Sequence, residues 1–121
     1  QMPSTQNYTV RDIILDRTIE VELHCSDTDW PSMFVTAKVD TGADKCSMDS
    51  SLIALLGWEQ VGTKTVKSSL GREKRDVYRG KVTMRGTTFY LDVNESDRTE
   101  LSHAILVGHN VIADLIALEE E

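Results

Sequence analysis

The chain has 121 residues and a formal net charge of −7 at pH 7, with 40% hydrophobic and 27% charged residues. This length corresponds to one domain, and the composition is typical of a globular protein rather than a disordered one. The acidic excess argues against bulk nucleic-acid binding, which needs Lys and Arg to displace counterions from phosphates. We therefore expect a single domain over residues 1–121, with a flexible polar tail at residues 1–9.

The first half of the chain is predicted to contain strands and one short helix. Alternating polar and apolar residues predict one or two strands in 10–23, with a turn near residues 16–17. Met33–Val39 is rich in strand-forming residues. Ser47–Leu56 has the apolar spacing of a short helix, and Gly57 is placed to end that helix.

The second half is predicted to form two hairpins, a short strand and a helix. The first hairpin has arms at Val61–Val66 and Val77–Val82, and the second has arms at Lys81–Met84 and Thr87–Val93 around Arg85-Gly86. After a polar loop at 94–100, we expect a strand at Ala104–Val107 ending at Gly108, and helical spacing at Val111–Leu118. No stretch approaches the roughly 18 apolar residues that span a bilayer.

The cysteines and histidines follow no metal-binding pattern. Cys25 and Cys46 lack disulfide-framework or zinc-ribbon spacing, and we interpret them as reduced thiols of a cytoplasmic protein, with a single bridge as the alternative. The histidines, His24, His103 and His109, fall in different predicted elements, whereas zinc needs three or four converging ligands. We therefore expect no metal and no cofactor.

A β-rich run that ends in Asp40-Thr41-Gly42 is the clearest chemical signal in the chain. Peptide hydrolysis by carboxylates uses two Asp groups that share one proton, because like charges roughly 3 Å apart cannot both ionise. One carboxylate acts as base on a water while the other donates to the scissile carbonyl. Asp40 would supply a carboxylate, Thr41 a hydroxyl beneath the pair, and Gly42 room for close backbone approach.

The Asp-Thr-Gly sequence occurs once in the chain. One chain therefore supplies one Asp, and a complete pair requires a second chain. A two-fold homodimer with the site on its axis is the economical arrangement. The alternative is a chance occurrence of three residues, as a turn after a strand.

The segment Val39–Asp44 resembles the active-site loop of retroviral aspartic proteases. Ala104–Ile112 resembles their second signature, in which an apolar strand ending in Gly packs beneath that loop. The chain more closely resembles the bacterial and phage family labelled ATP-dependent zinc proteases, which are retropepsin-like despite that label. The stretches that match this family are Ala37–Ala43, Val66–Gly71 and Ala104–Val111.

The resemblance implies an all-β, retropepsin-like closed barrel with one or two short helices, forming one protomer of a two-fold dimer. It implies Asp40 as the catalytic residue, supported by Thr41 and Gly42. It also implies a flap near Val66–Val77 with Gly71 at its tip. The residues that it places beside the substrate are Ala43, Asp44, Lys67, Ser68, Ser69 and Gly71.

One position departs from the family pattern. Retroviral proteases place Arg after the Gly of the second signature, and this chain has His109 there. In the retroviral case that Arg pairs with the Asp that matches Asp44. A His109–Asp44 contact is possible, and it would be charged only below about pH 6.5 unless the pair raises the His pKa.

Basic residues gather in the predicted flap. Between Lys64 and Arg85 there are eight Lys or Arg and two acidic residues, a net charge of +6. One interpretation is a solvated hairpin whose charges protect its edges from pairing. The other is attraction of an acidic peptide. The solvated hairpin is the more common outcome for such a charge run. The family resemblance gives content to the second interpretation, because relatives are associated with ligases that add glutamate tails to a ribosomal protein, and such tails are acidic.

The sequence thus predicts an aspartic endopeptidase that acts across a homodimer, with acidic, glutamate-rich peptides as a candidate substrate. The alternative is a non-catalytic retropepsin-like module that binds peptides or dimerises. We expect a peptide or protein substrate, and neither a nucleic-acid nor a membrane partner.

Overall fold

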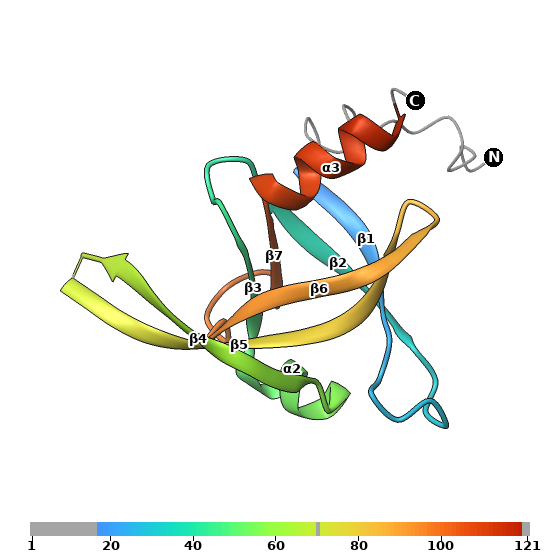
Figure 1. Ribbon diagram of the computed structural model, residues 1–121, viewed down its shortest axis with the longest axis horizontal. Helices are drawn as coiled ribbons and strands as arrows, with labels where there is room; N and C mark the ends of the chain where they lie inside the picture. The colour runs from blue at the N-terminus through green and yellow to red at the C-terminus, as the bar shows by residue number, and fades with distance from the viewer. Residues whose placement is uncertain (1–16, 70, 120–121) are drawn as a thin grey trace.

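The computed structural model describes residues 17–69 and 71–119 (Figure 1). Its strands are β1 (Thr18–Leu23), β2 (Met33–Asp40), β3 (Cys46–Asp49), β4 (Glu59–Ser68), β5 (Gly71–Met84), β6 (Thr87–Ser96) and β7 (Ile105–Gly108). Its helices are α2 (Ser50–Leu56) and α3 (His109–Glu119).

Six of these strands close into a barrel. Their order is β1-β2-β7-β3-β6-β5, and β5 returns to β1 through the pairs Glu22–Thr83 and Leu23–Val82. β4 lies outside this ring and pairs with β5 over Glu59–Ser68, so that the two strands extend from the barrel as a long hairpin (Figure 1). This all-β closed barrel with two short helices confirms the predicted fold class.

The core fills the inside of the barrel, because side chains alternate between the two faces of each strand. In β1, Ile19, Val21 and Leu23 are buried, whereas Glu20 and Glu22 lie on the other face. Burial of each such apolar side chain stabilises the fold by roughly 1.5–3 kcal/mol. The helices add Ile53, Leu56, Val111, Ile112 and Leu115 to the same core.

Several predicted elements are confirmed. Met33–Val39 lies within β2, and the hairpin at Arg85-Gly86 joins β5 to β6. Gly57 ends α2 in a left-handed conformation with φ of 70°, and its N–H donates to the carbonyls of Ile53 and Ala54. The predicted turn near residue 17 is present, with Arg17 at φ of 63°. The predictions for residues 1–16 lie outside the described residues.

Two predictions about local structure were wrong. Residues 47–49 belong to strand β3 and not to the helix, because β3 is paired on both sides, parallel to β6 and antiparallel to β7. The predicted polar loop at 94–100 is strand up to Ser96, since that stretch of β6 pairs with β3. Both errors concern pairings between segments distant in the sequence, which local patterns do not reveal.

Candidate active site

Asp40 lies at the end of β2, beside the end of β7. The two strands are parallel, and Asp40 pairs with Gly108. The chain then turns, and the N–H of Ala43 donates to the Asp40 carbonyl at 3.1 Å. The N–H of His109 donates to the Ala43 carbonyl at 2.6 Å, so the first residue of α3 is bonded to this turn. The structure thus brings together the two segments that carry the family resemblance.

Gly108 is required where the loop after Asp40 crosses β7. A Cβ atom at residue 108 would lie 2.6 Å from the Lys45 carbonyl oxygen and 2.9 Å from that of Ala43. Real Cβ atoms essentially never come so close to a backbone oxygen. Glycine therefore allows β7 to pack directly beneath the loop that carries Asp40.

The Asp40 carboxylate is half-buried and has one free oxygen. Its Oδ1 accepts the Gly42 N–H at 3.0 Å, and a Cβ at Gly42 would lie only 3.3 Å from this oxygen. Neither Oδ2 nor the hydroxyl of the exposed Thr41 has a hydrogen-bond partner among the described residues. The loop thus presents a carboxylate and a hydroxyl at the surface of a rigid barrel.

Cys46 lies beneath the same loop and is fully buried. The Gly108 N–H donates to its sulfur at 3.4 Å, and the thiol lies 4.0 Å from Asn110 Oδ1. Burial raises the pKa of the Cys46 thiol, although the Gly108 N–H opposes this shift. Cys25 and Cys46 are both free thiols, so the alternative of a bridge between them is not found.

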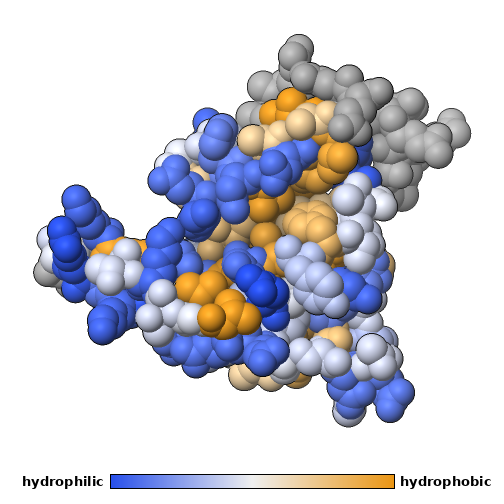
Figure 2. Space-filling view, viewed as in Figure 1, coloured by the Kyte–Doolittle hydropathy of each residue, from blue (hydrophilic) through white to orange (hydrophobic). Residues whose placement is uncertain are grey.

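The β4–β5 hairpin, hereafter the arm (residues 59–79), corresponds to the predicted flap. Figure 2 shows hydrophilic residues over most of it. The cross-strand pair Lys64–Arg75 is partly buried, whereas the pair Lys67–Arg72 is exposed, as expected when successive pairs face opposite sides. The arm therefore has an inner face toward the barrel and an outer face that carries Lys67.

The predicted tip of the flap lies slightly earlier in the chain than Gly71. Ser68 pairs with Gly71, and the turn between the strands contains the exposed Ser69. Gly71 itself is the first residue of β5, with φ of 120°, a conformation that favours glycine. Ala43 is partly buried in the Asp40 loop and Asp44 is exposed next to it.

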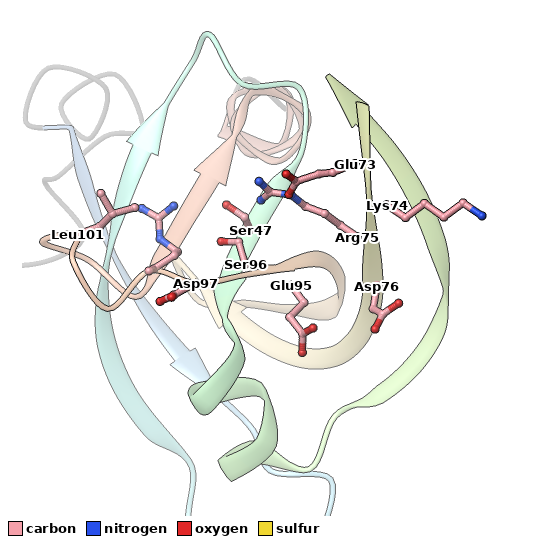
Figure 3. A pocket seen from close by; sticks show the side chains of 10 residues that line it. Ser47, Glu73, Lys74, Arg75, Asp76, Glu95, Ser96, Asp97 and Leu101 are labelled. Carbon is pink, nitrogen blue, oxygen red and sulfur yellow. The ribbon is translucent and has the colours of Figure 1, made fainter. Parts of the chain in front are cut away.

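A cavity of about 480 Å³ lies between the arm and the barrel (Figure 3). From the arm it is lined by Glu73, Lys74, Arg75 and Asp76, and from the barrel side by Ser47, Glu95, Ser96, Asp97, Arg98 and Leu101. None of these residues is a site residue predicted from the sequence. Arg75 and Lys74 belong to the basic stretch, but nothing local indicates that Arg98 lines the same cavity.

Asp49 holds the loop that carries Arg98. Its Oδ1 accepts the Arg98 backbone N–H at 2.7 Å, and its Oδ2 caps α2 by accepting the Ser51 N–H at 3.1 Å and the Ser51 hydroxyl. These bonds, first the one from the Ser51 hydroxyl, lower the pKa of Asp49. Further along the loop, Arg98 Nε donates to the His103 carbonyl at 2.9 Å.

The possible contact between His109 and Asp44 is not made within the chain, because the two exposed side chains form no ion pair. Over 17–69 and 71–119, no group of three or more His, Cys, Asp or Glu is arranged to hold a metal ion. In the same residues, no helix is long and apolar enough to cross a membrane.

Comparison with solved structures identifies the architecture. The simian foamy virus (mac) protease superposes with a TM-score of 0.58 at 19% identity, covering 86% of this chain and 97% of that one. The EIAV protease in complex with the inhibitor HBY-793 superposes with a TM-score of 0.60 at 16% identity, and the match covers 81% of this chain and 86% of that one. This is the retropepsin-like fold. Neither a family model nor a curated protein matches the sequence.

A bacterial protein shares the same retropepsin-like fold. Lpg0085 from Legionella pneumophila subsp. pneumophila str. Philadelphia 1, described as a DUF785 protein of unknown function, gives a TM-score of 0.52 at 18% identity. The match covers 81% of this chain and 84% of that protein. At these identities the likeness establishes the fold, and the chemistry has to be argued from the residues around Asp40.

Proposed function

We propose that this protein is an aspartic endopeptidase in which Asp40 supplies one carboxylate of a catalytic pair. The observation that carries the proposal is the Asp40 loop, seated on Gly108 at the ends of two parallel strands in a retropepsin-like fold. A pair of such carboxylates shares one proton, so that one activates a water and the other donates to the scissile carbonyl.

The second carboxylate comes from a second copy of the chain. Each chain has a single Asp-Thr-Gly, and the free Asp40 Oδ2 and the free Thr41 hydroxyl lie at the surface. A two-fold axis beside this loop would bring two Asp40 side chains together and let each loop bond to the other. The proposed active form is therefore a homodimer.

The substrate is a peptide, and the charge of the arm favours an acidic one. Over residues 59–79, six Lys or Arg and three Glu or Asp give the arm a net charge of +3. On the inner face Arg75 is paired with Glu73 at 3.0 Å, while Lys67, Arg72 and Lys74 are exposed. A basic surface beside the site raises the local concentration of acidic peptides, and this effect weakens as salt increases.

Digestion of a diverse peptide library tests the catalytic proposal. We expect the wild-type protein to produce new termini detected by mass spectrometry, and Asp40→Asn to produce none. The substitution keeps the side-chain size, so folding and dimerisation, followed by circular dichroism and sedimentation, should be unchanged. Equal cleavage by both proteins would refute the role of Asp40. Absence of cleavage by a folded wild-type dimer would favour the non-catalytic, peptide-binding module.

The acidic preference has its own test. Peptides of equal length, one glutamate-rich and one neutral, are digested at low and at high salt. We expect faster cleavage of the glutamate-rich peptide, with an advantage that shrinks as salt rises. Equal turnover of the two peptides, insensitive to salt, would exclude selection by charge.

A further inference from the structure

Arg98 is a largely buried cation that forms no ion pair with the residues that the structure describes. The residue is only 9% exposed. Its Nε donates to the His103 carbonyl, but the terminal Nη atoms have no hydrogen-bond partner and no ion pair among the described residues. Burial lowers the pKa of this guanidinium, although Asp49 opposes the shift, and arginine stays charged in proteins. The Nη atoms are not among the buried side-chain atoms that lack a partner, so they are open to solvent and can bind a ligand.

The nearby carboxylates do not fill this role. Both oxygens of Asp49 are occupied, one by the Arg98 backbone N–H and the other by Ser51. Asp97 accepts from the N–H and the hydroxyl of Thr99, at 3.1 and 2.7 Å. Neither carboxylate forms an ion pair with the Arg98 guanidinium. The side chain instead lines the cavity beneath the arm.

The cavity has three basic and four acidic lining residues, so the formal charge of its lining is −1. The arrangement of these groups nevertheless leaves a site for an anion. Glu73 is neutralised by Arg75. In Figure 3 the carboxylates of Glu95 and Asp76 point down, away from Ser47. Burial, and then the charges of Glu95 and Asp76, raise the pKa of Tyr78.

The cavity lies within reach of a peptide bound at Asp40. Ser47 pairs with Leu106, which also pairs with Lys38, two residues before Asp40. Ser47 and Asp40 are therefore separated by two strand spacings across the sheet and two residues along β2, a distance on the order of 12 Å. An extended peptide advances about 3.4 Å per residue, so a side chain about two to four residues from the cleaved bond would enter the cavity.

We propose that Arg98 is a specificity-determining residue, which binds the carboxylate of a substrate Glu or Asp side chain in the cavity beneath the arm. The planar guanidinium can bind a carboxylate through two parallel hydrogen bonds. The hydroxyls of Ser47 and Ser96 line the same cavity and can donate to the carboxylate as well. This inference rests on the proposed peptidase function, and it locates the acidic preference in one residue.

Binding, measured separately from cleavage, tests the inference. In the Asp40→Asn protein, calorimetry with hexaglutamate and hexaglutamine reports the two affinities without turnover. We expect hexaglutamate to bind more tightly, and Arg98→Gln to weaken it roughly 10- to 100-fold, the usual range for a charged hydrogen-bonded pair. Hexaglutamine binding should stay unchanged. The matched control is Arg79→Gln, which removes an exposed charge paired with Asp92 outside the cavity, and should change both affinities little.

A second variant decides the matter if Arg98→Gln does not fold, since Arg98 also bonds to the His103 carbonyl. Ser47→Glu leaves Arg98 in place and adds a carboxylate to the cavity wall, so it should lower hexaglutamate affinity alone. Equal binding of the two peptides, or hexaglutamate binding unaffected by either variant, would overturn the inference. If the protein binds hexaglutamate more tightly than hexaglutamine but the wild type cleaves no peptide, the peptidase proposal is refuted and the carboxylate site at Arg98 is still supported.

Discussion

Single residues determine how the Asp40 loop is held. Gly108 lets the loop lie against β7, since any side chain would overlap the carbonyls of Lys45 and Ala43. Gly42 keeps the backbone close enough to donate to Asp40 Oδ1. The carboxylate is therefore oriented by backbone groups, which hold it more rigidly than flexible side chains would.

At Gly108, replacement by Ala should destabilise the fold by about 1–3 kcal/mol, because the new methyl group has to displace backbone atoms. The same change should reduce peptide cleavage by moving Asp40. Urea unfolding measures the first effect, with Gly62→Ala as the control, since nothing lies within 4 Å of a Cβ there. That control should stay within about 0.5 kcal/mol of the wild type. An unchanged unfolding midpoint for Gly108→Ala would contradict the described packing.

The charge of Asp49 should make stability depend on pH. Its folded pKa lies below the ordinary 3.8, so the unfolded chain takes up the proton first as the pH falls. The stabilisation is then fully present above about pH 5 and is lost as the pH falls through the folded pKa. Asn is also a good helix cap, so Asp49→Asn mainly removes the charge. The difference in unfolding free energy between wild type and Asp49→Asn should shrink from pH 6.5 to pH 3; a constant difference would contradict this account.

Among the elements, the arm is packed against the barrel at its base and exposed at Ser69 and Gly71 near its tip. Trp58, between α2 and β4, is buried against Gly80 of β5, where a Cβ would lie 1.8 Å from the indole. The indole Nε1 donates to the His24 carbonyl at 2.8 Å. The turn at Ser69 and the start of β5 at Gly71 are exposed. The base of the arm is therefore held by buried contacts, whereas Ser69 and Gly71 near its tip are accessible to solvent.

Removal of the indole should weaken the base of the arm. Trp58→Phe leaves a small cavity and a buried His24 carbonyl without its donor, and should cost about 2 kcal/mol. Trp30→Phe is the matched control, because Trp30 is 66% exposed and its replacement should change stability by less than about 0.5 kcal/mol. Chemical denaturation of both variants checks this. Equal midpoints for the two proteins would show that Trp58 does not anchor the arm.

Some of the elements could be predicted from local sequence patterns, and others could not. Strand β2, the turn at Arg85-Gly86 and the end of α2 at Gly57 follow from local patterns and were predicted correctly. The predicted helix wrongly includes residues 47–49 of β3, because these residues become a strand only through pairing with β6 and β7. The Asp40 loop was recognised from its motif. The cavity was not, since Arg98 is brought there by a loop whose path depends on Asp49.

At the scale of the whole molecule, the protomer carries half of the proposed catalytic site. The barrel is closed, so no strand edge of its ring has to be completed by a partner. The exposed loop at Asp40 is different, because one chain has one Asp-Thr-Gly and the chemistry needs two carboxylates. Assembly and activity should therefore depend on protein concentration together, which sedimentation and dilution assays can follow.

The contribution of one Asp40 from each of two chains can be measured directly in mixed dimers. Wild-type protein is mixed with Asp40→Asn protein, allowed to exchange subunits, and assayed on a peptide that the wild type cleaves. A mixed dimer holds one Asp40 and should be inactive, so an equal mixture should show about half of the activity per wild-type chain, falling further as the variant is added in excess. Activity that stays proportional to the wild-type chains, with subunit exchange demonstrated, would contradict a catalytic pair shared between two chains.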